Sequence, residues 1–262
     1  MGKELFVKDL FSVKGKVALV TGGSRGIGLM IARGFVENGV KTYISSRDAQ
    51  ACASVAEELS KEGTCIALPA DLSTSAGVEH VATALKEKES QLDILVNNAG
   101  ANWAAPIDEY PESGWDKVLN LNLKSVFFLT QAMLPLLRKA GTKEDPARVI
   151  NIGSIDGLHA PGLETYAYSA SKSAVHHMTR VLAQRLTREN VTVNAIAPGP
   201  FESKMMAVTL KTFGEAIVAA CPRGRIGVPE DMAGTAIYLS SKAGAYVTGV
   251  VIAVDGGIST TL

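Results

Sequence analysis

Short runs of apolar residues alternate along the chain with longer stretches in which apolar residues recur at helical spacing. Because the short runs are apolar at successive positions, they are typical of strands buried on both faces of a parallel sheet. Seven runs are predicted as strands, at residues 16–21, 40–46, 65–69, 92–96, 149–153, 191–197 and 250–254. The longer stretches are predicted as helices, at residues 26–38, 48–62, 75–88, 115–139, 168–189 and 229–240.

The regular alternation of these elements predicts the fold class. Units of strand, helix and strand with these lengths form crossovers that place helices on both faces of a parallel sheet. We therefore expect an α/β protein with a doubly wound, Rossmann-type sheet of about seven strands. No repeat or linker divides the chain, so residues 1–262 are expected to form a single domain. Pro135 is expected to kink the long helix over 115–139 or to end its first part.

The alternation stops at Pro198-Gly-Pro200 and resumes near residue 229. The segment 201–228 carries Met205, Met206 and Phe213 among glycines and prolines, which is typical of a mobile lid over a pocket. These apolar residues would suit an apolar substrate tail, although methionine-rich helices more often serve ordinary packing.

The composition argues against several classes of protein. Lysine plus arginine and aspartate plus glutamate number 26 each, so no net charge favours nucleic acid or an anionic membrane. The apolar runs are far shorter than the roughly 20 residues that span a bilayer, which predicts a soluble protein. Three widely spaced cysteines without a Cys-x-x-Cys pattern are typical of reduced thiols in the cytoplasm. The four histidines lack metal-ligand spacing, and His176 and His177 are expected to face a neighbouring helix.

A glycine-rich turn follows the first predicted strand. In Thr21-Gly-Gly-Ser-Arg-Gly-Ile-Gly28 the glycines at 22, 26 and 28 lie between a strand and a helix. Such a turn lets the backbone approach a pyrophosphate closely, and the helix N-terminus favours the anion. An ordinary glycine turn is the alternative, but the context favours a dinucleotide site.

The end of the second predicted strand indicates which dinucleotide is bound. An acidic residue there would bind the ribose 2′-hydroxyl of NAD, whereas this chain has Ser45-Ser46-Arg47. The Arg47 guanidinium can bind a 2′-phosphate, and Arg25 in the glycine turn can add a second positive charge. We therefore expect NADP(H), although Asp48 is adjacent and a solvated surface arginine is the alternative.

Tyr168-Ser-Ala-Ser-Lys172 places a phenol and an ammonium four residues apart, on one face of a helix. A tyrosine titrates near ~10, and a neighbouring cation favours its phenolate and lowers its pKa. The pair can therefore serve acid–base chemistry on a carbonyl. The spacing alone also occurs on many ordinary helix faces.

Four motifs occur in one order along nearly the whole chain: Thr21 to Gly28, Asn97 to Gly100, Tyr168 to Lys172, and Pro198-Gly199. In these motifs the chain resembles the short-chain dehydrogenases/reductases. Within that family it is most similar to the ketoacyl reductases, in particular the NADPH-dependent 3-oxoacyl reductases of rhamnolipid synthesis.

The resemblance implies a catalytic tetrad of Asn122, Ser154, Tyr168 and Lys172. The Ser154 hydroxyl would hydrogen-bond the carbonyl oxygen, and Tyr168 would deliver the proton. Lys172 would stabilise the phenolate and hold the nicotinamide ribose. Asn122, through its carbonyl or its side chain, would hold a water beside the lysine.

The same resemblance implies the residues that bind the cofactor. They are Gly22, Ser24, Arg25, Gly26, Ile27, Gly28, Ser46, Arg47, Asp71, Leu72, Asn98, Ala99, Gly100, Tyr168, Lys172, Pro198, Gly199 and Phe201. Asp71 and Leu72 match the family's adenine contacts. Phe201 and Ser203 stand where related proteins often have an aliphatic residue and a threonine near the carboxamide, so contacts at these two positions are open.

The leading hypothesis is NADPH-dependent reduction of a 3-oxoacyl thioester, bound to a carrier protein or to coenzyme A, to its 3-hydroxyacyl product. A polyol, sugar-acid or steroid dehydrogenase is the alternative enzyme, because these motifs specify hydride chemistry rather than substrate. A non-catalytic NADP(H)-binding sensor is the third possibility. Resemblance also implies a homotetramer or dimer, paired through the two long central helices and through the last helix and strand.

Overall fold

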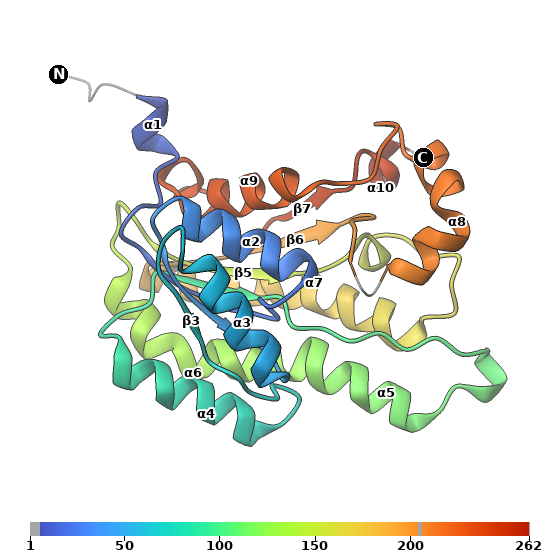
Figure 1. Cartoon of the computed structure of the whole chain (residues 1–262), viewed down its shortest axis with the longest axis horizontal. Helices are drawn as coiled ribbons and strands as arrows, with labels where there is room; N and C mark the ends of the chain where they lie inside the picture. Colours follow the sequence, from blue (N-terminus) through green and yellow to red (C-terminus); the bar gives the residue numbers. More distant parts are fainter. Residues whose placement is uncertain (1–5, 204–205, 262) are drawn as a thin grey trace.

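A computed structural model describes residues 6–203 and 206–261 and shows one parallel sheet with helices on both faces (Figure 1). Its strand order is β3-β2-β1-β4-β5-β6-β7, and every neighbouring pair is parallel. The strands are β1 Val17–Thr21, β2 Lys41–Ser45, β3 Cys65–Ala67, β4 Ile94–Asn97, β5 Ala147–Ile152, β6 Val191–Pro198 and β7 Val251–Val254. The predicted fold class, a single doubly wound domain, is confirmed.

Ten α-helices lie within the described residues. They are α1 Val7–Leu10, α2 Gly26–Glu37, α3 Ala49–Leu59, α4 Ser75–Lys88, α5 Glu112–Leu119, α6 Ser125–Ala140, α7 Tyr166–Leu186, α8 Ala207–Ala220, α9 Pro229–Ser240 and α10 Ile258–Thr261. None of them is both long enough and apolar enough to cross a bilayer.

The core has two halves, one on each face of the sheet. In β1, Ala18 and Val20 pack into one half with residues of α2, α3 and α9. Leu19 points to the other face and packs into the half formed with α4, α6 and α7. This explains why the strands are apolar at successive positions, since helices cover both faces.

The long helix predicted over 115–139 is interrupted, but at a different place from the one expected. Pro135 lies inside α6, which continues to Ala140. The interruption is a wider π-helical turn at Asn120–Lys124, between α5 and α6. Helix α6 is held against the core on both sides of the proline, by buried Met133, Leu136 and Leu137. Single π turns are frequently found at functional sites, and this one carries Asn122.

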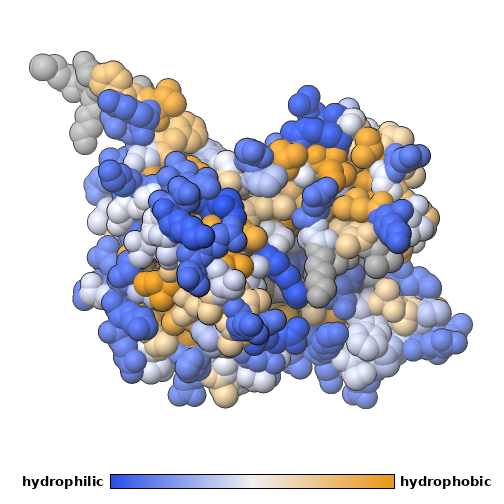
Figure 2. Space-filling model, in the orientation of Figure 1, coloured by the Kyte–Doolittle hydropathy of each residue, from blue (hydrophilic) through white to orange (hydrophobic). Residues whose placement is uncertain are grey.

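The segment 201–228 contains α8, a helix that the sequence pattern did not predict. The two ends of the segment are joined, because Phe201 forms a β-bridge with Gly227 and the Gly227 N–H donates to the Pro200 carbonyl at 2.9 Å. Phe213 on α8 is 54% exposed, and Figure 2 shows apolar residues gathered over this helix. Met205 lies outside the described residues. Movement of this segment as a lid stays a prediction.

Candidate active site

Most of the predicted site residues gather at the carboxyl edge of the sheet, because their motifs follow strands. The turns after β1, β2, β3, β4, β5 and β6 carry, respectively, Gly22 to Gly28, Ser46 and Arg47, Asp71 and Leu72, Asn98 to Gly100, Ser154, and Gly199. β1 and β4 are neighbours in the sheet although two strands separate them in sequence. The strand order reverses at this point, which is where doubly wound sheets bind their ligands.

The glycine turn is shaped for close approach of a ligand to the backbone. Gly22 and Gly26 have φ of 65° and 53°, in the region that favours glycine. A Cβ at Gly28 would overlap the Gly22 carbonyl oxygen. Arg25 precedes the first turn of α2 and makes no side-chain capping bond. The N-terminus of α2 therefore fits the pyrophosphate of a dinucleotide.

Thr21 and Asn98 join the glycine turn to the turn after β4. The Thr21 hydroxyl accepts from the N–H groups of Asn98 and Ala99, both at 2.9 Å, and donates to the Val96 carbonyl. The Asn98 side-chain amide donates to the carbonyls of Thr21 at 2.8 Å and of Gly22 at 3.3 Å. Asn98, which was predicted to contact the cofactor, therefore also stabilises the glycine turn. Thr21 was missed as a site residue, although its place before the first glycine was a signal.

The turns after β1 and β2 each present an arginine to solvent. Arg47 and Arg25 are both exposed. Asp48, the acid beside Arg47, caps α3 by accepting a hydrogen bond from the Ala51 N–H at 3.0 Å. The Ser46 hydroxyl donates to the Asp48 carbonyl at 3.1 Å. Asp48 therefore has a structural role in helix capping, and the arrangement fits a 2′-phosphate.

Two residues predicted to contact the cofactor have buried side chains. Leu72 is 4% exposed and Phe201 is 2% exposed, and both belong to the core. The Phe201 ring occupies the space where a Cβ at Gly227 would lie. Only main-chain atoms of Leu72 and Phe201 can therefore meet a ligand without rearrangement. Ser203 lies against the glycine turn, 3.2 Å from where a Cβ at Gly26 would be.

Ser154 and Tyr168 are brought together by β5 and α7. Ser154 follows β5, is 8% exposed, and caps a 3-10 turn at Ile155–Gly157 by accepting from the Asp156 N–H at 3.2 Å. Tyr168 lies in the first turn of α7. Burial raises the pKa of Tyr168 to about 12, although its hydrogen bond with Ser154 lowers the pKa and the Asp156 charge raises it.

The pKa of Tyr168 thus moves upward, opposite to the lowering expected from Lys172. The reason is that desolvation of the phenolate outweighs the favourable interactions. The Lys172 Nζ lies 5.4 Å from the centre of the Tyr168 ring, and it donates to the Ile152 carbonyl at 2.7 Å. The ammonium is therefore bonded to the backbone at the end of β5.

Lys172 is itself 5% exposed, and burial lowers its pKa to about 8 while Asp156 raises it. Burial raises the pKa of Asp156, and the charges of His159 and Lys172 lower it. Asp156 is an acidic group of the site that the sequence analysis missed. Its only signal was its place two residues after Ser154.

Asn122 links the site to the loop after β4. Its side-chain oxygen accepts from the Ala101 N–H at 2.8 Å, and its amide donates to the Ala101 carbonyl and to the Ser171 hydroxyl. The Ser171 hydroxyl in turn donates to the Tyr168 carbonyl at 2.7 Å. Both amide hydrogens of Asn122 are thus used within the protein. Of the two ways in which Asn122 was expected to hold a water, this arrangement favours its main-chain carbonyl.

Known proteins are similar to this chain in sequence and in fold. A family model described as short chain dehydrogenase matches residues 16–212. The rhamnolipids biosynthesis 3-oxoacyl-[acyl-carrier-protein] reductase of Pseudomonas aeruginosa is 53% identical over 94% of this chain and 97% of that protein. The gluconate 5-dehydrogenase of Gluconobacter oxydans is 34% identical over 97% of this chain and 98% of that protein. The solved Pseudomonas aeruginosa RhlG/NADP active-site complex has a TM-score of 0.93 and 52% identity, covering 96% of this chain and 99% of that one. The chain therefore belongs to the short-chain dehydrogenase/reductase family.

Proposed function

We propose that the protein reduces 3-oxoacyl thioesters to 3-hydroxyacyl thioesters with NADPH. The observation that carries the proposal is the placement of Ser154 and Tyr168 next to each other and beside the buried Lys172, on the same sheet edge as the glycine turn. The proposal is supported by the 53% identity to a reductase of Pseudomonas aeruginosa named for 3-oxoacyl groups on acyl carrier protein.

In this reaction the protein positions the carbonyl and supplies a proton. NADPH provides the hydride that adds to the carbonyl carbon. Ser154 donates a hydrogen bond to the carbonyl oxygen, and Tyr168 transfers its phenol proton to that oxygen. A Tyr168 pKa near 12 keeps the phenol protonated at neutral pH, which is the form that the reduction needs. Once the carbonyl oxygen has accepted the proton, the single hydroxyl proton of Ser154 is free to be donated to the phenolate and to stabilise it.

Acetoacetyl and longer 3-oxoacyl thioesters, presented on coenzyme A and on carrier protein, test the proposal by NADPH oxidation. Tyr168→Phe removes the proton donor and is expected to abolish turnover while NADPH affinity is kept. Tyr166→Phe is a matched control, because Tyr166 is exposed and its hydroxyl bonds Glu164 at 2.9 Å. Wild-type protein that oxidises no NADPH with any of these thioesters would overturn the proposed substrate.

For the cofactor, the proposal assigns the pyrophosphate to the glycine turn and the 2′-phosphate to Arg47 and Arg25. Arg47→Ala is expected to weaken NADPH binding much more than NADH binding. Arg33→Ala is the control, since exposed Arg33 pairs with Glu58 at 2.5 Å on the outer surface of α2 and α3. An equal loss of NADPH and NADH affinity in Arg47→Ala would contradict the choice of NADP(H).

Sugar-acid oxidation is the second candidate, favoured by the 34% identity to the gluconate 5-dehydrogenase of Gluconobacter oxydans. Assays of gluconate and related polyols with NADP⁺, beside the thioester reductions, separate the two activities. Binding of NADPH without turnover of any carbonyl or alcohol, unchanged in Tyr168→Phe, would favour a sensor instead.

We propose that the segment 201–228 closes over the acyl chain. Its support is the exposed apolar surface of α8, which includes Phe213. Phe213→Ser is expected to raise KM for long acyl thioesters more than for acetoacetyl thioesters, because the short substrate has no chain to bury. An equal change for both substrates would contradict this role.

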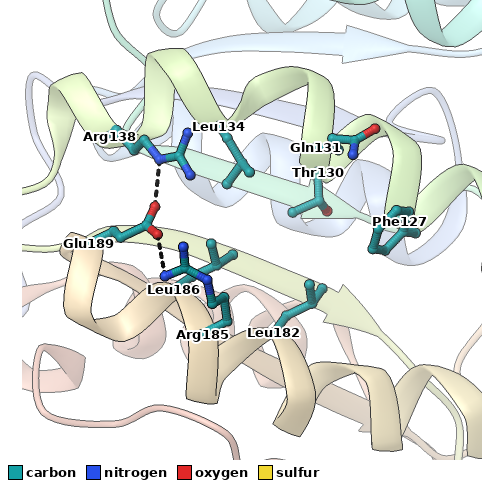
Figure 3. Close-up of a pocket in the computed structure, with 9 residues that line it drawn as sticks. All are labelled: Phe127, Thr130, Gln131, Leu134, Arg138, Leu182, Arg185, Leu186 and Glu189. Atoms are coloured by element: carbon teal, nitrogen blue, oxygen red, sulfur yellow. Dashed lines mark hydrogen bonds and ion pairs between the residues drawn. The ribbon is translucent and has the colours of Figure 1, made fainter.

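We also propose that the protein assembles as a homotetramer, or as a dimer, through the face formed by α6 and α7. Figure 3 shows apolar side chains along this face, including Phe127, Leu134 and Leu182. At its end Glu189 pairs with Arg138 at 2.6 Å and with Arg185 at 2.7 Å. Light scattering after size-exclusion chromatography measures the assembly, and a monomer at micromolar concentration would contradict it.

A further inference from the structure

The buried imidazole of His176 lies behind the turn that carries Ser154. His176 is on α7, one helical turn after Lys172, and is 2% exposed. It was expected to face a neighbouring helix, yet it faces the end of β5 and the 3-10 turn Ile155–Gly157. The reaction described above makes no use of this ring.

The ring fills the space left by two glycines that flank the Ser154 turn. The three atoms nearest to a Cβ placed at Gly153 are all in the His176 ring, Nε2, Cδ2 and Cε1, and Nε2 would overlap that Cβ. A Cβ at Gly157 would lie 2.8 Å from Cε1 of the same ring. One imidazole therefore contacts the backbone immediately before Ser154 and three residues after it.

These contacts are steric. Neither nitrogen of the His176 ring makes a hydrogen bond of ordinary geometry within the described residues. Burial lowers the pKa of His176 to about 4, the nearby Gly157 backbone raises it, and the charges of Lys172 and Arg180 lower it. The ring is therefore uncharged at neutral pH and acts as a rigid planar body.

Ser154 depends on this backbone. Its hydroxyl accepts from the Asp156 N–H at 3.2 Å, and its carbonyl accepts from the Gly157 N–H at 3.0 Å. On the outer side the Ser173 hydroxyl donates to the Gly157 carbonyl at 3.1 Å. A shift of the turn at Gly153 or Gly157 would therefore move the Ser154 hydroxyl relative to the Tyr168 phenol.

We propose that His176 is a positioning residue, whose ring is packed between Gly153 and Gly157 and fixes the Ser154 hydroxyl against Tyr168 and the substrate carbonyl. This inference rests on the proposed function, since it takes Ser154 to act on the carbonyl. A displacement of about 1 Å at such a group can reduce turnover by on the order of 100-fold.

Paired substitutions test the role of the ring. His176→Ala removes the ring that packs against Gly153 and Gly157, and Gly153→Ala places a methyl group where it would overlap the ring. Each single variant is expected to lose kcat by about tenfold or more, with KM and the NADPH Kd nearly unchanged. The double variant is expected to regain much of the kcat lost in Gly153→Ala, because the nearest atoms in the way of the methyl belong to His176.

Gly157→Ala is the matched control. A Cβ at Gly157 would also lie 2.7 Å from the Lys172 carbonyl carbon and 2.8 Å from the Ser173 nitrogen, and both are backbone atoms. Adding His176→Ala to Gly157→Ala should therefore restore little activity. Equal restoration in the Gly153 and Gly157 pairs would show that the ring does not act through Gly153, and would overturn the inference.

A second readout does not depend on turnover. Amide hydrogen exchange at residues 154–157 in the cofactor-free protein is expected to accelerate in His176→Ala, while exchange in β6 stays slow. Full kcat in His176→Ala, or unchanged exchange in this turn, would refute positioning by the ring. Wild-type protein that reduces no carbonyl would instead refute the proposed function, and the exchange experiment would still report on the ring.

Discussion

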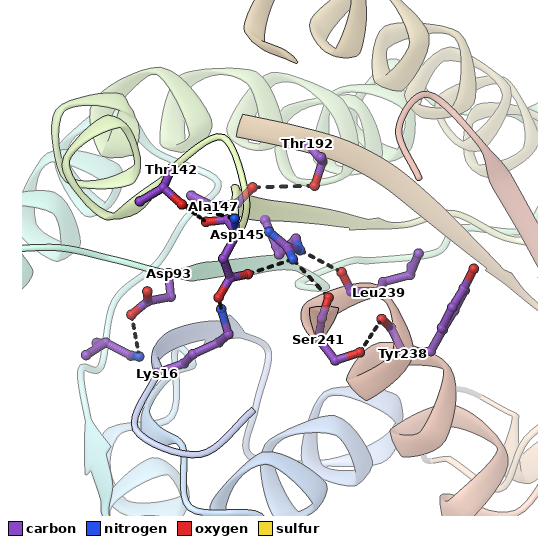
Figure 4. Close-up of polar contacts among 11 residues, drawn as sticks. Lys16, Asp93, Thr142, Asp145, Ala147, Thr192, Tyr238, Leu239 and Ser241 are labelled. Carbon is purple, nitrogen blue, oxygen red and sulfur yellow. Dashed lines mark hydrogen bonds and ion pairs between the residues drawn. The ribbon is translucent and has the colours of Figure 1, made fainter. Parts of the chain in front are cut away.

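Among the residues that the structure describes, one arginine and one lysine are buried, Arg148 and Lys172, and they are held in different ways at opposite edges of the sheet. Arg148 on β5 is 1% exposed and lies near the amino edge. Its guanidinium donates to the carbonyls of Leu239 and Ser241 and to the carboxylate of Asp145, each at 2.9 Å. Figure 4 labels these three acceptor residues. The arginine therefore ties β5 to the C-terminal end of α9 and to the loop before β5.

Lys172, at the carboxyl edge, donates to the single carbonyl of Ile152. Asp156 acts on the ammonium through its charge, and burial lowers the pKa of Lys172 to about 8. A guanidinium stays charged in proteins and forms several directed bonds, whereas a buried amine changes its pKa readily. Arg148 therefore suits a fixed structural role, and Lys172 suits a site where charge and protons change.

Replacing Lys172 is expected to give the largest effect, and it affects activity rather than stability. Lys172→Met should reduce kcat by roughly 10² to 10⁴, the range for loss of a group in acid–base catalysis. The free energy of unfolding at pH 7 should change by about 1 kcal/mol or less, because removing a desolvated charge offsets the lost bond to Ile152. Steady-state kinetics and urea unfolding of the same preparation measure both. A loss of several kcal/mol of unfolding free energy with normal kcat would show that Lys172 has the structural role assigned here to Arg148.

Replacing Arg148 should give the opposite result. Arg148→Met leaves the carbonyls of Leu239 and Ser241 without their donor and is expected to cost about 3 to 5 kcal/mol of unfolding free energy. Asp145 keeps its bond from Lys16 at 2.7 Å. The protein that remains folded should have nearly normal kcat. Arg148→Lys serves as the control, because it keeps the charge but not the fork of donors. Its unfolding free energy, measured with denaturant, should lie between those of the wild type and Arg148→Met.

The pH dependence of stability distinguishes the two cations further. Between a folded pKa of about 8 and an ordinary value of 10.5, unfolded chains retain the Lys172 proton that the folded protein has lost. The contribution of Lys172 to the free energy of unfolding is therefore constant below that pH window and rises with pH across it. By pH 9.5 the rise should be about 2 kcal/mol relative to Lys172→Met. Arg148→Met should not remove this rise, and its loss there would contradict the assignment to Lys172.

The sequence predicted elements whose signals are local. The last helix was expected over 229–240 and is observed as Pro229–Ser240, since proline opens it and the Asp231 carboxylate caps the Val228 N–H. The glycine turn and Tyr168 were found in the same way, because each motif follows a strand or opens a helix.

Contacts between segments that are far apart in the chain could not be predicted from the spacing of residues in the sequence. Helix α8 contains Gly214 and is followed by Pro222, residue types that are typical of loops, so the sequence did not predict this helix. Thr21, Asp156 and His176 act through contacts that form only when β4, β5 and α7 are packed together. The raised pKa of Tyr168 likewise depends on burial, which the motif alone does not contain.

Asp156→Asn is expected to give the smallest effect, and it tests how the carboxyl edge tunes its proton donor. The Asp156 charge raises the pKa of Tyr168 and that of Lys172, so removing it should lower both. Reduction needs the protonated phenol, and its rate should therefore begin to fall at a lower pH than in the wild type. Oxidation needs the phenolate, and its rate should begin to rise at a lower pH. Arg148→Lys, remote from this edge, should leave both profiles in place, whereas profiles unchanged in Asp156→Asn would mean that the carboxylate does not act on Tyr168.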